Sequence, residues 1–238
     1  MKMIQRGLAF LAALSLICVL CITAAEGAIY WDFGYYQKEY EKYEVLDELY
    51  MEMDDVMHVT EEMMAYLRGD REELSVETSV EGRNQDFFNE QDRFHMKEVQ
   101  DIFCRALVIR WVALGIFVVS MGALLLWKAD WKKMVSKWYM GLVGCLTVLC
   151  GVLAYFITKN FNQCFVIFHE IFFDNDLWMF NPEEDYMIRM LPEGLFADFT
   201  VRIAVFAGIA LAVFFLLGWI LYRNAKRKEE DRDLFDIS

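Results

Sequence analysis

Four apolar stretches constrain the fold of this chain more than any other feature of its sequence. A helix needs about 20 apolar residues to cross the hydrocarbon core of a bilayer. Residues 7–25, 102–127, 139–157 and 199–222 meet that requirement. Charged residues gather in blocks between these stretches, and 57% of the chain is hydrophobic. That composition is too apolar for a soluble domain and predicts an all-α polytopic membrane protein with four transmembrane helices.

The basic residues predict how the four helices are oriented. They form three clusters: Lys2 and Arg6 before the first helix, Lys128, Lys132, Lys133 and Lys137 between the second and third, and Arg223, Lys226, Arg227 and Lys228 after the fourth. In a four-helix topology all three clusters fall on one side, which is the pattern of cytoplasmic loops. We therefore expect both termini of this multi-pass membrane protein in the cytoplasm, with the two longer loops outside.

This topology divides the chain into eight segments. The predicted order is transmembrane helix 1 (1–29), an extracytoplasmic cap (30–101), transmembrane helix 2 (102–127), a cytoplasmic loop (128–138), transmembrane helix 3 (139–158), an extracytoplasmic loop (159–198), transmembrane helix 4 (199–222) and a cytoplasmic tail (223–238). The small residues Thr23, Ala24 and Ala25 also suit a signal-peptide cleavage site. The apolar run is longer than a signal peptide needs, which favours a retained helix.

The first outer loop is long enough to form a small α+β cap. Residues 40–67 contain no Pro or Gly and repeat apolar residues at helical spacing, which predicts a helix that ends at Gly69. Residues 74–80 alternate apolar and polar side chains, which predicts a strand that ends near Gly82. Residues 30–101 carry 21 acidic and 7 basic side chains, so nucleic acid is not an expected partner.

The six cysteines do not form a recognisable disulfide framework. Four lie inside apolar runs, where cysteine is usually a small buried hydrophobe. Cys104 and Cys164 lie near membrane boundaries on the same predicted side, so a bridge between them is an open possibility. The chain has no CxxC pair in an aqueous loop, so a metal site of that type is not expected.

Two of the three histidines are the strongest candidates for chemistry. His95 lies just before the second apolar stretch, and His169 lies in the loop between the third and fourth. The topology places both on the outer side of the membrane. Histidine exchanges protons near neutral pH, so this pair suggests proton transfer at the membrane surface. His58, inside the acidic helix, is expected to be an ordinary solvated residue.

Other residues near the two histidines are candidates for substrate binding. Arg105 and Arg110 lie on the predicted helix that follows His95; Arg110 is about 12 Å inside the membrane-spanning part, where charged groups are costly. Arg105 can pair with Asp101 one turn away, or extend to headgroups without a further role. The loop after His169 adds Asn175, Trp178 and Asp185. Its aromatic side chains are expected to lie in the lipid interface: Phe165, Phe168, Phe172, Phe173 and Trp178. The run Glu183–Asp185 after Pro182 is expected to begin a solvated helix.

Two sequence segments resemble a known family. The first segment reads FHEIFFDNDLW, followed by NP and DYMIRMLPEGLF, and the second, upstream of it, reads FFNEQDRFHMKEVQDIF. Both resemble segments of the bacterial lipoprotein intramolecular transacylases, which are four-span membrane proteins of Gram-positive bacteria. The resemblance extends to the layout of almost the whole chain. It implies that His95 and His169 match the two essential histidines of that family.

The resemblance also implies an activity. These enzymes use no cofactor and act on a lipoprotein whose N-terminal cysteine carries a diacylglyceryl group and a free α-amino group. They move the sn-2 acyl chain from the glycerol oxygen to that amino group and so produce the lyso-form lipoprotein. The implied partners are a diacylated lipoprotein and membrane lipid.

The chemistry of the residues suits this reaction. Attack of an amine on an ester needs a base, a proton for the leaving oxygen, and stabilisation of the oxyanion. One histidine can exchange the proton, while the other histidine, with Arg105 or Arg110, polarises the carbonyl. Two alternatives fit the same sequence: a phospholipid-directed hydrolase or transferase, with the arginines binding phosphate, and a non-catalytic membrane interaction protein.

Overall fold

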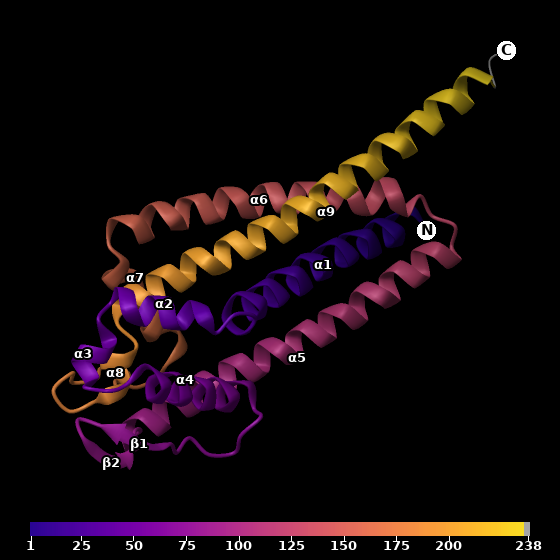
Figure 1. The fold of residues 1–238 in the computed structure, drawn as a ribbon. Coiled ribbons are helices and arrows are strands. Elements are labelled where there is room, and N and C mark those ends of the chain that lie inside the picture. Colours follow the sequence, from indigo (N-terminus) through magenta and orange to yellow (C-terminus); the bar gives the residue numbers. More distant parts are fainter. Residues whose placement is uncertain (236–238) are drawn as a thin grey trace. The chain divides into compact units, whose positions relative to one another are not determined.

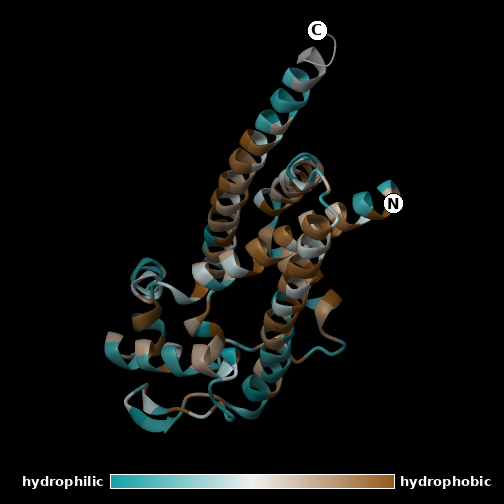
Figure 2. Cartoon of the chain, turned by 90° about the vertical axis from the view of Figure 1, so that its right-hand side faces the viewer, coloured by the Kyte–Doolittle hydropathy of each residue, from teal (hydrophilic) through white to brown (hydrophobic). Residues whose placement is uncertain are grey.

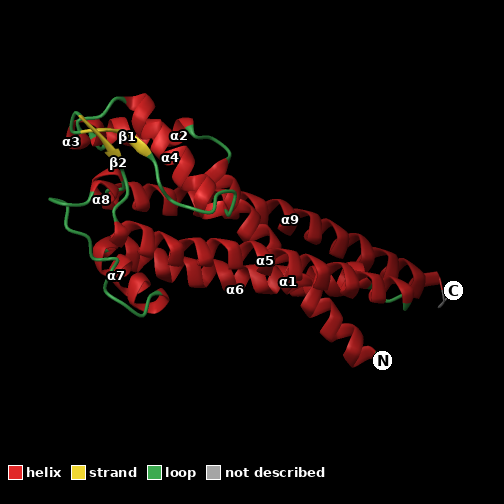
Figure 3. Ribbon diagram, turned by 90° about the horizontal axis from the view of Figure 1, so that it is seen from below, coloured by secondary structure: helices red, strands yellow, loops and turns green. Residues whose placement is uncertain are grey.

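The computed structural model describes residues 1–235 and is mainly helical (Figures 1 and 3). In chain order the elements are α1 (Lys2–Tyr30), α2 (Gly34–Lys42), α3 (Val45–Leu49), α4 (Met53–Arg68), β1 (Glu77–Val80), β2 (Arg83–Asp86), α5 (Glu90–Leu126), α6 (Trp131–Lys159), α7 (Phe161–Phe172), α8 (Tyr186–Met190) and α9 (Glu193–Phe235). Among the described residues, four helices are long and apolar enough to cross a membrane: α1, α5, α6 and α9. The expected fold class, an all-α polytopic membrane protein with a small α+β part, is therefore confirmed.

Two compact units make up the fold. The helical unit contains residues 1–25, 108–155 and 204–238, and the histidine unit contains residues 26–107 and 156–203. The helical unit thus holds most of each long apolar helix. The histidine unit holds all the short helices and the hairpin, together with His95 and His169.

The helical unit packs through small and aromatic side chains. Ala9, Ala12 and Ala13 of α1 are completely buried, which lets the neighbouring helix backbones approach closely. The hydroxyl of Tyr139 on α6 donates a hydrogen bond to the carbonyl of Leu211 on α9, 3.1 Å away. Many other apolar side chains of these helices remain exposed, as expected where lipid surrounds the protein. Figure 2 shows α9 changing from hydrophobic to hydrophilic toward its C-terminal end.

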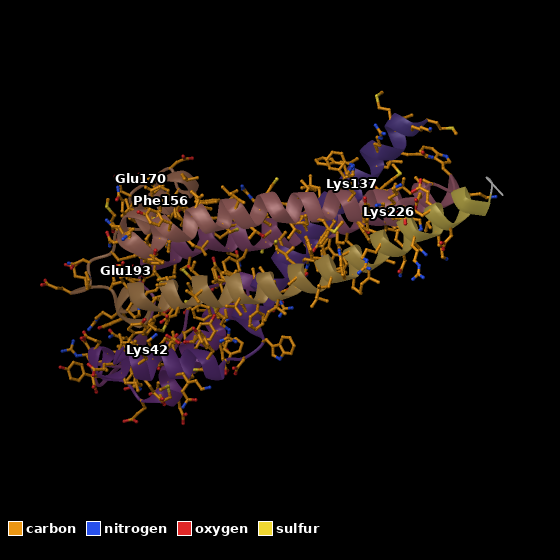
Figure 4. All side chains as sticks on the ribbon, turned by 90° about the horizontal axis from the view of Figure 1, so that it is seen from above. Lys42, Lys137, Phe156, Glu170, Glu193 and Lys226 are labelled. Carbon is orange, nitrogen blue, oxygen red and sulfur yellow. The ribbon has the colours of Figure 1, made fainter. Side chains whose placement is uncertain are left out.

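Two of the three basic clusters come together in the helical unit. Lys133 at the start of α6 forms an ion pair with Glu229 near the end of α9. Figure 4 labels Lys137 and Lys226 at the same end of these two helices. The loop before α6 and the tail of α9 therefore lie on one side of the unit, which is the arrangement that the positive residues predict.

The histidine unit has its own apolar core. Its largest fully buried side chains come from α2, α3, α4, the segment before α5, α8 and the start of α9: Tyr40, Leu49, Val56, Phe87, Phe88, Met190 and Leu195. One polar pair is enclosed within this core. The hydroxyls of Tyr40 and Thr60 lie 2.7 Å apart, so each satisfies the other.

The predicted helix at 40–67 is divided into three in the structure. Glu44 and Tyr50 both adopt left-handed backbone conformations, with φ of 55° and 50°, and they flank the five-residue helix α3. These two residues break the helix although neither is a glycine. Periodicity alone does not reveal these breaks, because apolar side chains on separate short helices can keep the same spacing.

The predicted strand at 74–80 is shorter than expected and has a partner that the sequence did not reveal. β1 covers Glu77–Val80 and pairs antiparallel with β2, Arg83–Asp86. Glu81 and Gly82 form the connecting turn, both with positive φ, as a tight hairpin requires. β2 was missed because all four of its residues are polar, so it has no apolar alternation.

The six cysteines are all free thiols in the structure. This result includes Cys104 and Cys164, the pair for which the sequence left a bridge open. The fold is therefore held together by packing and hydrogen bonds, without a covalent cross-link at these two positions.

Candidate active site

His95 lies in the second turn of α5, and the start of that helix is firmly fixed. Asn89 and Asp92 form a reciprocal capping box: the Asn89 side-chain oxygen accepts from the Asp92 backbone N–H at 3.0 Å, and the Asp92 carboxylate accepts from the Asn89 N–H at 2.9 Å. The two preceding residues, Phe87 and Phe88, are buried in the core. The position of His95 is therefore set by anchored residues immediately before it.

His169 lies on α7, which is separated from the end of α6 by a single residue, Asn160. Asn160 caps α7 by accepting a hydrogen bond from the backbone N–H of Gln163 at 3.1 Å. The His169 Nδ1 atom lies 2.8 Å from the carbonyl oxygen of Phe165. A carbonyl can only accept, so Nδ1 carries the hydrogen in this contact. In the neutral ring, Nε2 is then left as the basic nitrogen.

The two imidazoles lie side by side in an aromatic setting. Their ring centroids are 5.9 Å apart and their planes are inclined by 29°. Phe173 contacts both rings, at 4.8 Å from His95 and 5.4 Å from His169. Trp178 stacks on His169 at 4.8 Å, and Phe180 meets His95 edge-on at 5.4 Å. Residues 74 positions apart in the sequence therefore form one histidine pair.

Burial keeps both histidines neutral near physiological pH. His95 and His169 are 6% and 7% exposed. Both lie outside the apolar stretches that cross the membrane. Desolvation lowers the pKa of His95 to about 4, with a smaller contribution from His169. Desolvation also lowers the pKa of His169, although its bond to Phe165 opposes that change. Neutral imidazoles can accept a proton from a reacting group, as general-base catalysis requires.

The loop after α7 is fastened to α5 by amide–carboxylate contacts. The Asn175 side-chain amide donates to Glu98 Oε1 at 2.9 Å. The Asn89 amide donates to Asp185, and the Asp185 carboxylate also accepts from the backbone N–H of Asn181 at 2.9 Å. These contacts hold the segment that carries Trp178 and Phe180 against the helix that carries His95.

The five predicted substrate-binding residues differ in their surroundings. Trp178 touches His169 directly, while Asn175 and Asp185 fasten the loop. Arg105 is exposed on α5. Its expected partner Asp101 pairs with Lys97 instead, at 3.4 Å. Arg110 belongs to the helical unit, where its guanidinium lies 5.6 Å from the centre of the Trp111 ring.

Two expectations for the loop itself need correction. Phe173 is 5% exposed and packs against the histidines, so it does not lie in the lipid interface, whereas Phe168 and Phe172 remain about half exposed. The acidic run Glu183–Asp185 does not form a helix. α8 begins at Tyr186, and Asp185 occupies its N-cap position and is buried. The hydrogen bonds to Asn89 and Asn181 account for that burial.

Sequence reasoning missed two acidic residues beside His95. Asp92 and Glu98 lie three residues before and after it on α5, at the spacing that places side chains close together. Desolvation raises the pKa of Asp92 to about 7, and the neighbouring Asp185 adds to that rise. The i, i+3, i+6 spacing was the available signal for this group. Among the described residues no group of three or more His, Cys, Asp or Glu side chains is arranged to hold a metal ion.

Asp92 should make stability depend on pH. Its pKa is raised from 3.8 to about 7 in the folded protein, so its contribution to the free energy of unfolding is full below pH 4 and is lost as the pH rises to 7. Asp92→Asn lacks this titration. We expect the unfolding midpoint of the variant to rise by several degrees relative to wild type between pH 4 and pH 7, then stay level. Thermal unfolding of both proteins in detergent, between pH 4 and pH 7, measures this change in the midpoint. A midpoint difference between variant and wild type that does not depend on pH would contradict the raised pKa of Asp92.

The site of this integral membrane protein holds two neutral imidazoles side by side among aromatic side chains that exclude water. Such a site is suited to proton exchange during the transfer of a chemical group. The family model "Lipoprotein intramolecular transacylase Lit" matches residues 10–196. The chain therefore belongs to the lipoprotein intramolecular transacylase family. It is a membrane-integral acyltransferase with lipoproteins as substrates, and this membership decides against the phospholipid-directed and non-catalytic alternatives.

Solved structures support the same fold. The in meso structure of the membrane integral lipoprotein intramolecular transacylase Lit from Bacillus cereus matches with a TM-score of 0.74 and 22% identity, covering 97% of this chain and 99% of that one. Histidine-to-arginine and histidine-to-alanine variants of the Bacillus cereus protein each match with a TM-score of 0.72 and 22% identity, covering 97% and 96% of this chain and 96% of theirs. A search of curated proteins gave no match.

Proposed function

We propose that His95 and His169 together catalyse transfer of the sn-2 acyl chain of a diacylglyceryl-cysteine lipoprotein to that cysteine's own α-amino group. The observation that carries this proposal is the 5.9 Å separation of the two imidazole centroids. Both rings are buried and neutral, and aromatic side chains exclude water from them. A site of this kind can exchange one proton while favouring amine over water as the nucleophile.

The transfer balances without any other reactant. The neutral α-amine attacks the ester carbonyl, a C–N bond forms, and the carbonyl oxygen becomes an oxyanion. The amine nitrogen then loses one proton, and the C–O bond to glycerol breaks as the oxygen of that bond gains a proton. Because the amine and the ester belong to one molecule, holding them together supplies much of the rate.

The two histidines suit different parts of this reaction. The hydrogen bond from Nδ1 to Phe165 leaves Nε2 of His169 as the basic nitrogen, so we assign His169 as the group that takes the proton from the amine and returns it to glycerol oxygen. His95 is neutral because desolvation lowers its pKa to about 4. A neutral imidazole can donate its N–H to the oxyanion, which is the role we assign to His95.

Trp178 completes the substrate site in this proposal. Its ring covers His169, where it can shield the acyl ester from water. Asn175 and Asp185 act by positioning the loop that carries Trp178. The exposed Arg105 is suited to anionic headgroups near the membrane surface, whereas Arg110 belongs to the membrane-spanning part of α5.

We also propose that the site faces the extracytoplasmic side of a bacterial cell membrane. The basic loop before α6 and the basic tail of α9 lie together, and positive residues of this kind mark the cytoplasmic side. His95 precedes the apolar part of α5 and His169 follows the apolar part of α6, so both belong to the opposite side.

Expression in a bacterial strain that lacks lipoprotein N-acylation tests the proposed function. Mass spectrometry of lipoprotein N-termini should show one acyl chain on the α-amino group and one on glycerol, with the total mass of the diacyl form unchanged. An empty vector is the control. Lipoproteins that keep a free amino group in the presence of the membrane-inserted protein would refute the proposal.

A further inference from the structure

Three side chains on one arc of α5 each bury an atom that accepts no hydrogen bond and donates none within the described part of the chain. These atoms are Asp92 Oδ1, His95 Nδ1 and Glu98 Oε2. The residues are spaced by three, so they cover about 9 Å of the helix and an arc of about 120°. Buried polar atoms are nearly always satisfied, so a row of three calls for an external partner rich in donors.

The two carboxylates in this row are not equivalent. Asp92 is fully buried, and its second oxygen is used by the capping box. Glu98 remains partly exposed, and its Oε1 is held by Asn175, so that Oε2 is fixed as a free acceptor. Glu98 is therefore the carboxylate of the row that belongs to a partly exposed residue, with its free Oε2 enclosed beside its Asn175-bound Oε1, and its neighbour one turn earlier is His95.

We propose that Glu98 binds the α-amino group of the lipoprotein's N-terminal cysteine and presents it to the histidine pair. This inference rests on the proposed function and names the group that selects the amine. An ammonium has three donors and a positive charge, which matches an unpaired carboxylate oxygen. Glu98 holds the amino group both as ammonium, through an ion pair, and as neutral amine, through a hydrogen bond.

The position of Glu98 along α5 agrees with where that amino group must lie. The apolar stretch of α5 begins at residue 102, four residues later, so Glu98 stands about 6 Å outside the hydrocarbon core and His95 about 10 Å outside it. The polar headgroup layer is about 5–8 Å thick on each side. A cysteine tethered to two acyl chains through glycerol holds its α-amino group in that layer.

The proposed role of Glu98 agrees with the proton balance of the reaction. The bound ammonium first releases one proton to water to become the neutral amine. The second proton leaves the nitrogen during C–N bond formation and passes through His169 to the glycerol oxygen. Glu98 takes neither proton permanently, because its role is to hold the nitrogen near the ester while both leave.

Binding of two unreactive lipopeptides tests the inference without relying on turnover. Both carry ether-linked chains on glycerol, which cannot be transferred; one has a free α-amino group and the other is N-acetylated. We expect wild-type protein in nanodiscs to bind the free-amine form about ten- to a hundred-fold more tightly, the range for a hydrogen bond to a charged group. In Glu98→Gln this preference should disappear, while affinity for the N-acetylated form stays unchanged and reports an intact fold.

Glu170→Gln is the matched control, since it removes an exposed carboxylate from α7, the helix that carries His169 (Figure 4). It should keep the wild-type preference. If Glu98→Gln does not fold, Glu98→Met, whose side chain is of similar length and apolar, is the second variant. Its affinities for the free-amine and N-acetylated lipopeptides are compared in the same way. A wild-type protein without preference for the free amine, or a Glu98 variant that keeps it, would overturn the inference. Failure of the proposed function would show itself separately, as wild-type protein that forms no N-acyl product from an ester substrate.

Discussion

Replacing His169 with alanine should lower the rate of lyso-lipoprotein formation by about 10²- to 10⁴-fold, the usual contribution of a general acid–base group. In the proposed mechanism this variant loses the nitrogen that accepts the amine proton, and no other described side chain stacks on Trp178 in its place. We expect His95→Ala to cause a loss in the same range, because the oxyanion then lacks its donor. Single-turnover assays with an ester-linked diacyl lipopeptide, analysed by mass spectrometry, measure both rates.

The third histidine provides the control for this experiment. His58 is exposed on α4, and His58→Ala should keep the wild-type rate. The double variant, His95→Ala with His169→Ala, should be little slower than either single variant, because residues that act as one unit are not additive. A rate within a few fold of wild type in either single variant would remove that histidine from the mechanism.

Phe87→Ala should cause the largest loss of stability among the changes considered. Phe87 is 1% exposed and packs against Phe88 and Tyr186, with ring centroids 5.1 and 5.9 Å away. Removing a buried phenylalanine ring costs about 3–5 kcal/mol, through lost burial and the cavity that remains. The effect should include the active site, because Phe87 anchors the chain just before the capping box that sets the position of His95.

Unfolding in detergent, followed by the accessibility of the free thiols, measures this loss. The matched control is Phe94→Ala, since Phe94 is 52% exposed on α5 and next to His95. Its free energy of unfolding should change by less than about 0.5 kcal/mol. If both variants were equally stable, Phe87 would not anchor the start of α5.

The sequence predicted those features that depend on local composition. Apolar length identified all four membrane helices, and the position of His95 and His169 beside two of them singled out the pair that the structure brings together. The family resemblance was confirmed by the match over residues 10–196. One predicted transmembrane hairpin separates His95 from His169. Because a hairpin returns the chain to the side from which it started, this separation was enough to predict that the two histidines lie on the same side.

Features that depend on tertiary contacts were not predictable in this way. The left-handed conformations of Glu44 and Tyr50 have no local signature, since neither residue favours positive φ. The burial of Asp185 depends on Asn89, which lies 96 positions earlier. The spacing of Glu98 from His95 placed it nearby, but its fixed orientation depends on the hydrogen bond from Asn175, which lies 77 positions later.

The order of the two histidines along the chain has a consequence for biosynthesis. His95 is synthesised before the apolar part of α5, and His169 only after the apolar part of α6. A nascent chain interrupted between them holds one imidazole and no partner. If the proposed mechanism holds, acyl transfer begins only once both membrane crossings of the hairpin are complete, and an incompletely inserted copy leaves the lipoproteins around it unmodified.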